Sequence, residues 1–101
     1  GETIEVLTYW RVLARPARPL SLMLHLTGAG EVPVAVGDGL GVPVDQWQPG
    51  DIIVQRHILE IPKNINSGSY RLWAGAYWLD TMMHLMSADH QAILLREIGL
   101  R

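Results

Sequence analysis

Apolar residues recur at every second position over several stretches of this chain, and this pattern restricts its fold more than any other feature. Between Leu20 and Leu26, leucines occupy every other position. Successive side chains of a β-strand point to opposite faces of a sheet, so these leucines would line one face, whereas a helical stripe would repeat about every 3.6 residues. Residues 4–12 and 69–78 alternate in the same way. The pattern therefore predicts an all-β fold.

Segments rich in proline and glycine separate these stretches. Two prolines within 15–19 exclude a helix there, and glycines mark turns or loops at 27–30 and 37–43. Further strands are expected at 31–36 and 51–61. Short strands separated this regularly are typical of a β-sandwich or β-barrel. We expect an immunoglobulin-like antiparallel β-sandwich of about seven strands.

The core of this sandwich is predicted from the apolar face of each strand, together with two aromatic residues near strand ends. Tyr70 follows a turn, at the position where immunoglobulin-like domains carry a tyrosine whose hydroxyl binds nearby backbone. Trp47, just ahead of a tight turn, is expected to close one end of the core. The predicted core consists of Ile4, Val6, Trp10, Leu20, Leu22, Leu24, Leu26, Leu59, Ile61, Tyr70, Leu72 and Ala74.

The C-terminal segment, residues 87–101, fits two structures. Ala92, Leu95 and Ile98 have the spacing of a helical stripe, and residues 87–90 could cap such a helix. A buried terminal strand over residues 92–98 agrees better with the pattern of the rest of the chain. We therefore favour the strand.

Composition and charge narrow the function classes. The chain has 101 residues, which fits a single domain over 1–101, and its 49% apolar and 18% charged residues exclude a disordered segment. A formal net charge of -2 provides no basic surface, so no nucleic-acid partner is expected. The chain has no cysteine, which excludes disulfides and thiolate metal sites. No stretch approaches the roughly 18 consecutive apolar residues of a membrane span, so no direct membrane insertion is expected.

Candidate catalytic and metal-binding residues do not form a recognisable pattern. The two closest of the four histidines, His84 and His90, lie on an expected loop without the tight spacing of zinc ligands. The serines lack a nucleophile-elbow context, and no glycine-rich loop precedes a helix. We therefore expect no catalytic residue, no metal and no cofactor. A small enzyme remains a remote alternative.

The candidate ligand-binding residues are Tyr9, Arg11, Trp73 and Tyr77, which the alternation places on strand faces opposite the main core. Tryptophan and tyrosine combine a large apolar ring with a polar tip, so they suit half-buried and interface positions. One interpretation is a glycan-binding surface in which the rings stack on sugars. The other is a second buried face that packs on a neighbouring domain, since burial on both faces produces the same composition. We favour the neighbouring domain.

The order of several short motifs resembles a known domain family. Residues 1–6, 9–13 and 24–26 are followed by Trp-Gln-Pro-Gly-Asp at 47–51 and Gly-Ser-Tyr-Arg-Leu at 68–72, with Leu-Glu-Ile-Pro between them. Together they are similar to the β-sandwich domain found toward the C-terminal end of bacterial multi-spanning membrane proteins, many of which resemble mannosyltransferase-type glycosyltransferases. The resemblance implies a non-catalytic accessory domain of a larger protein, on the extracytoplasmic side of a membrane, with neighbouring domains as its partners.

The chain departs from the family pattern in one hairpin and at its start. The family usually has Val-Gly-Leu-Tyr-Asp after the tyrosine strand, whereas residues 74–78 read Ala-Gly-Ala-Tyr-Trp. The glycine and threonine that usually follow are replaced at 79–83. The pattern also begins after an upstream strand of the family, which would leave a strand edge exposed. Because an unpaired edge is a template for another strand, we expect that this edge could support a homodimer.

Overall fold

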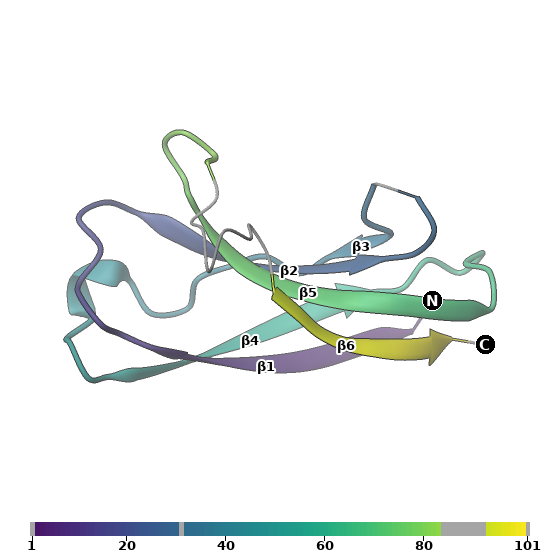
Figure 1. Cartoon of the computed structure of the whole chain (residues 1–101), viewed down its shortest axis with the longest axis horizontal. Coiled ribbons are helices and arrows are strands. Elements are labelled where there is room, and N and C mark those ends of the chain that lie inside the picture. The colour runs from purple at the N-terminus through teal and green to yellow at the C-terminus, as the bar shows by residue number, and fades with distance from the viewer. Residues whose placement is uncertain (1, 31, 84–92, 101) are drawn as a thin grey trace.

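The computed structural model describes residues 2–30, 32–83 and 93–100 (Figure 1). This part of the chain forms two antiparallel sheets that lie one over the other as two layers. One sheet pairs β1 with β4, and the other has the strand order β3-β2-β5-β6. The strands are β1 (Thr3–Arg11), β2 (Leu20–Thr27), β3 (Ala35–Val36), β4 (Ile52–Glu60), β5 (Gly68–Trp78) and β6 (Ile93–Leu100), and a 3-10 turn covers Val44–Gln46. The predicted all-β fold is confirmed.

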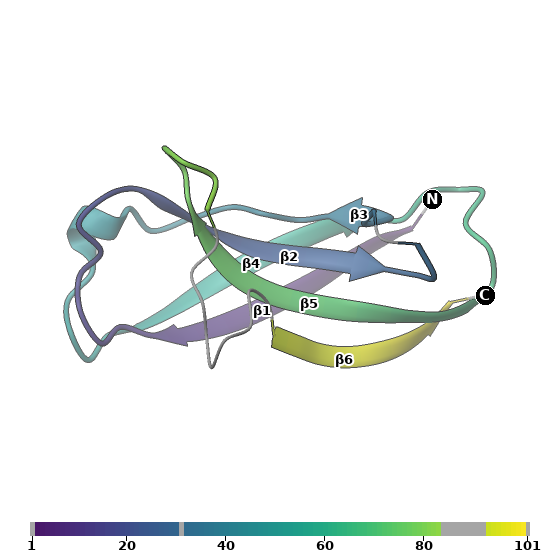
Figure 2. The same ribbon diagram turned by 45° about the horizontal axis from the view of Figure 1, so that its top comes forward.

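The strands of the two layers cross at an angle, as Figure 2 shows for β1 and β4 against β2 and β5. Sheets that pack face to face normally cross in this way because each sheet is twisted. The described part of the chain contains six strands, where about seven were expected. Within the described ranges, no helix has the length and hydropathy needed to span a membrane.

Alternation along the strands is borne out by the burial of their side chains. In β4 every second residue is buried, and the inward positions of β1 are buried or half-buried while its outward positions are exposed. The leucines of β2 are 0–3% exposed. β2 differs from the other strands because its opposite face is also covered, with Ser21 at 6% and Met23 at 3% exposure. β2, one of the two inner strands of the larger sheet, is therefore buried on both faces over residues 20–24.

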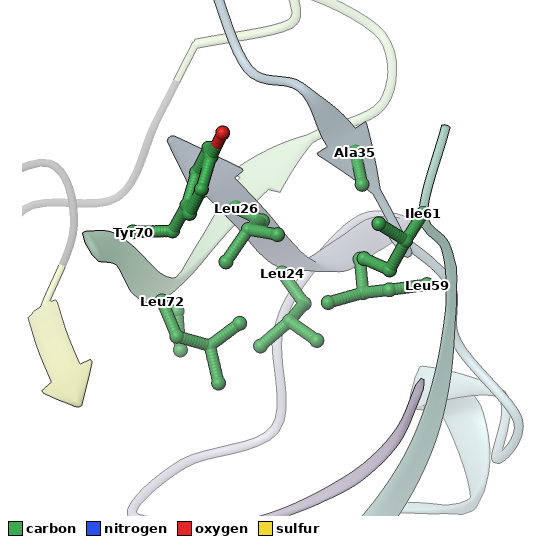
Figure 3. Packing of buried hydrophobic residues seen from close by; sticks show 8 residues of the cluster. Leu24, Leu26, Ala35, Leu59, Ile61, Tyr70 and Leu72 are labelled. Carbon is green, nitrogen blue, oxygen red and sulfur yellow. The ribbon is translucent and has the colours of Figure 1, made fainter. Parts of the chain in front are cut away.

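The core between the sheets consists of two clusters that both contact Trp10, the second of which contains Val12, Leu20, Leu22, Trp47 and Ile53. Figure 3 shows the first cluster, in which Leu24, Leu26 and Leu72 lie on one side and Leu59 and Ile61 on the other, while the hydroxyl of Tyr70 points away from these side chains. All residues predicted for the core belong to the clusters, with Ile4, Val6 and Trp10 only partly buried. The prediction missed buried apolar residues at Val12, Met23, Ala35 and Ile53 as core members.

Both aromatic residues assigned to structural roles occupy those roles. The Tyr70 hydroxyl donates a hydrogen bond of 2.6 Å to the carbonyl oxygen of Asn66, four residues earlier. The Trp47 ring is 5% exposed in the second cluster, and its Nε1 donates to the Val42 carbonyl oxygen at 2.9 Å. Each ring therefore fills part of the core while its polar atom finds a backbone partner.

Two predicted segments differ in extent from the structure. Of the short strand expected at 31–36, the described residues 32–36 form a strand only at Ala35–Val36, since Pro33 has no N–H to donate to a neighbouring strand. At the C-terminus, Ile93–Leu100 pairs with β5 as a strand, so the helical alternative is wrong for these residues. The expected burial of this strand is also wrong, because β6 lies at the edge of the larger sheet and residues 94–97 and 99 are exposed. Ala92 and the proposed cap at 87–90 lie outside the described residues.

Candidate functional site

The outward face of the β1–β4 sheet carries large apolar side chains that are open to solvent. β1 pairs with β4 without a register shift, so Tyr9 lies opposite Val54 and Glu5 opposite Ile58. Exposed fractions range from 38% for Ile58 to 67% for Tyr9. We call this surface the β1–β4 outer face; its large apolar members are Leu7, Tyr9, Ile52, Val54 and Ile58.

Charged residues surround and interrupt these apolar side chains. A guanidinium nitrogen of Arg56 lies 2.8 Å from a carboxylate oxygen of Glu5, diagonally across the two strands. Both side chains are at least half exposed, so the pair contributes about 0–1 kcal/mol to stability. Arg11 is exposed at the end of β1, opposite Ile52. The face therefore has an apolar centre beside charges of both signs, as interfaces with a polar rim do.

The inward side of the same sheet contains a hydrogen-bonded histidine. Nδ1 of His57 lies 2.7 Å from the carbonyl oxygen of Gly37, which can only accept, so Nδ1 carries a proton. His57 Nε2 lies 2.7 Å from Oγ1 of Thr8, and that oxygen accepts a hydrogen bond from Trp10 Nε1 at 2.7 Å. With Nε2 unprotonated, the Thr8 hydroxyl donates to it and every polar atom in the chain of contacts has a partner. His57 is 1% exposed and serves packing between the sheets, with no access to a ligand.

The outward face of the larger sheet differs, because its polar side chains bind one another. Trp73 lies opposite His25 in the β2–β5 pairing, and its Nε1 donates to Oγ1 of Thr27 at 2.9 Å. The Tyr77 hydroxyl donates to a carboxylate oxygen of Asp38 at 3.2 Å. We call this surface, formed by His25, Thr27, Asp38, Trp73 and Tyr77, the β2–β5 outer face.

Asp38 is the centre of the β2–β5 outer face. One of its carboxylate oxygens accepts the backbone N–H of Leu24 at 2.9 Å and lies 3.3 Å from Nε2 of His25. The side chain is only 18% exposed. Because backbone and side-chain donors converge on it, the carboxylate is held in place by several groups at once.

The four predicted ligand-binding residues all lie on outward faces, but on different sheets. Tyr9 and Arg11 belong to the β1–β4 outer face, and Trp73 and Tyr77 belong to the β2–β5 outer face. The two faces lie on opposite sides of the sandwich, so the structure does not bring the four residues together into one surface. Asp38 was not among the predicted site residues.

A groove at one end of the sandwich has a volume of about 770 Å³ and a mainly apolar lining. Its two arginines already have partners. Arg15 donates from Nε to the Trp47 carbonyl oxygen at 2.8 Å. The Arg18 guanidinium lies 4.4 Å from the centre of the Trp78 ring and 3.7 Å from a carboxylate oxygen of Asp80. These contacts fix the β1–β2 connection against the end of the core.

Among the residues that the structure describes, no group of three or more metal-binding side chains could hold an ion. His84 and His90 lie outside the described residues, so the structure does not bear on them. Comparison of the chain with protein-family models, with curated proteins and with solved structures found no match.

Proposed function

We propose that this chain is a non-catalytic accessory domain of a larger extracytoplasmic or membrane-anchored protein, and that it docks on a neighbouring domain through the β1–β4 outer face. The observation that carries the proposal is the row of solvent-exposed apolar side chains on that face. A group of exposed large apolar side chains beside polar residues is typical of interaction sites, and a partner that covers these side chains would remove them from water. A glycosyltransferase-like parent follows from the family resemblance alone.

The strand pairing supports an immunoglobulin-like assignment of the fold. In such domains strands B and E pair in one sheet, strands C, F and G form the other, and a tyrosine at the start of F binds nearby backbone. The pairs β1–β4 and β2–β5–β6 correspond to B–E and C–F–G, with Tyr70 at the start of β5. This class of sandwich is widely used for attachment and recognition, which fits an accessory role.

Carbohydrate recognition is the second candidate, and it is favoured by the β2–β5 outer face. There Trp73 and Tyr77 lie on the same strand and beside the polar groups of His25 and Asp38. An aromatic ring next to fixed hydrogen-bonding groups is a suitable arrangement for a sugar. Titration of tryptophan fluorescence with a panel of oligosaccharides tests it: a saturable change that Trp73→Phe abolishes would favour sugar binding over docking.

The docking proposal is tested with Val54→Lys and Ile58→Lys, two charged substitutions at the centre of the β1–β4 outer face. In the 101-residue chain they change the free energy of unfolding by no more than about 0.5 kcal/mol, since both side chains point to solvent. In the full-length protein that contains the domain, they weaken docking. Protease cleavage on either side of the domain should then become several-fold faster.

Val32→Lys is the matched control, because Val32 is 78% exposed on a connection away from this face. It should leave cleavage of the full-length protein unchanged. The proposal is wrong if the docking-face variants are cleaved at the wild-type rate, or if the protein encoded around this segment contains no further domain.

A further inference from the structure

Among the residues that the structure describes, no strand pairs with the outer edge of β1 in the smaller sheet. Two hydrogen bonds, one beyond each end of the β1–β4 pair, show which backbone groups of β1 face β4. At one end the Ile61 N–H donates to the Glu2 carbonyl oxygen at 2.8 Å, and at the other the Val12 N–H donates to the Asp51 carbonyl oxygen at 2.9 Å. Even-numbered residues of β1 therefore bind β4. Because backbone groups alternate in direction along a strand, the N–H and C=O groups of the odd-numbered residues project from the other edge. No described strand pairs with them.

The opposite edge of the sheet, along β4, is closed by the chain itself. The side-chain amide of Gln55 donates to the Arg56 carbonyl at 2.8 Å and accepts the N–H of Gly41 at 2.6 Å. Gly37 lies so close to this edge that a Cβ there would be 2.9 Å from the Ile58 carbonyl oxygen. A further strand could therefore be added beside β1 but not beside β4.

β1 lacks most of the features by which exposed edge strands usually avoid pairing. Proline, charged side chains (lysine above all), a bulge or a very short length normally protects such an edge, and of these β1 has only the charges of Glu5 and Arg11. β1 is nine residues long, contains neither proline nor lysine, and pairs with β4 in one continuous register. Its open edge is therefore a competent template for another strand.

We propose that β1 pairs antiparallel with β1 of a second copy of this chain, in the two-fold register that places Thr8 opposite Thr8. In this register Glu5 of each copy lies opposite Arg11 of the other, so two ion pairs form across the edge, with each Glu5 carboxylate shared between that arginine and Arg56 of its own chain. Leu7 lies opposite Tyr9 on the same face. The dimer goes beyond the proposed docking function, because it uses the edge of β1 and leaves the outward side chains of β4 free.

The charges of β1 favour this register over those in which the two-fold axis passes through an adjacent residue. Directly opposite residues must point to the same face, so a two-fold axis must pass through a residue of β1. An axis at Leu7 would place Glu5 opposite Tyr9, and an axis at Tyr9 would place Leu7 opposite Arg11. Only the axis at Thr8 matches opposite charges. Opposite-charge pairs directly across two strands are favourable, and like charges are unfavourable.

An apolar groove beside the edge supports the same arrangement. It has a volume of about 400 Å³ and runs between β1 and β6, with Ile4, Val6, Leu72 and Ile98 in its lining. In the proposed register, Trp10 and Val12 of the second copy lie beside Val6 and Ile4. The second strand would therefore bring apolar side chains to the mouth of this groove. Because a single strand edge is a small interface, we expect a weak dimer that dissociates on dilution.

Complementary charge reversals test the dimer by sedimentation equilibrium of the 101-residue chain. Glu5→Arg and Arg11→Glu each place like charges opposite one another at both ends of the interface, and each should weaken dimerisation by about tenfold or more. An equimolar mixture of the two variants again juxtaposes opposite charges, so a mixed dimer should form with near-wild-type affinity. Glu60→Arg and Arg71→Glu, which make the same charge changes on exposed residues away from the edge, should leave the wild-type dimer intact, alone or mixed.

Cysteine cross-linking tests the register, and the chain contains no native cysteine that would interfere. Leu7→Cys and Tyr9→Cys would lie opposite one another as a hydrogen-bonded pair, about 5.5 Å apart between Cα atoms and within disulfide range. Oxidation of an equimolar mixture should give mainly the mixed covalent dimer. The proposal is overturned if the wild-type chain remains monomeric up to millimolar concentration, if the charge-reversed mixture does not associate, or if Leu7→Cys alone cross-links as efficiently as the mixture.

Discussion

The two outward faces of this sandwich are both formed by antiparallel strands, but they differ in whether their side chains have partners within the molecule. On the β2–β5 outer face, the polar groups of Trp73, Tyr77 and His25 contact Thr27 or Asp38 within the molecule. On the β1–β4 outer face, apolar side chains such as Tyr9 and Val54 project into solvent. The first face is therefore largely completed by its own contacts. The second gains free energy only when something else covers it.

Substitutions on the two sides of β4 should show the largest contrast, because neighbouring residues there face the core and the solvent. Leu59 is 0% exposed and Ile58 is 38% exposed. Leu59→Ala should lower the free energy of unfolding by about 3 kcal/mol, through lost burial and the cavity left between the sheets. Ile58→Ala should cost less than about 1 kcal/mol. Urea denaturation of both variants measures the difference, and equal losses would mean that the β1–β4 outer face is not free in the isolated chain.

A smaller contrast is expected between the carboxylates of the two faces. Asp38→Ala removes the acceptor of the Leu24 N–H and the partner of Tyr77, so it should cost about 1–3 kcal/mol. Glu5→Ala removes only an exposed ion pair with Arg56 and should cost about 0–1 kcal/mol. Thermal denaturation of the two variants at one pH compares them. If Glu5→Ala lowered the stability as much as Asp38→Ala, the difference between the internally bonded β2–β5 outer face and the solvent-exposed β1–β4 outer face would be contradicted.

Much of the fold, but less of the candidate site, could be predicted from residue patterns. Alternation placed Tyr9 and Trp73 on outward positions because side-chain direction is a local property of a strand. It could not show that β1 and β5 belong to different sheets, since strand pairing depends on contacts between segments far apart in the sequence. Asp38 lies in a glycine-rich loop without periodicity, so no local pattern marked it as a partner of Tyr77.

The inward row of β4 was harder to predict for a related reason. Its buried positions include Gln55 and His57, so apolar residues do not simply alternate with polar ones along this strand. These polar side chains are buried because Gly41 and Gly37, on the connection after β3, supply their hydrogen-bonding partners. A buried polar residue is tolerated only where such a partner exists, and the partner is set by the tertiary structure.

The smallest contrast uses the same substitution on both faces. Tyr77→Phe removes a hydroxyl that donates to Asp38 and should lower the free energy of unfolding by about 1 kcal/mol, the usual value for one hydrogen bond. Tyr9→Phe should change it by less than about 0.5 kcal/mol, because Tyr9 is 67% exposed and its hydroxyl makes no hydrogen bond with the residues that the structure describes. Both variants keep the ring, so apolar burial does not confound the comparison. Chemical denaturation of the two proteins side by side resolves a difference of this size, and a Tyr9 effect equal to that of Tyr77 would show that the β1–β4 outer face has an intramolecular partner after all.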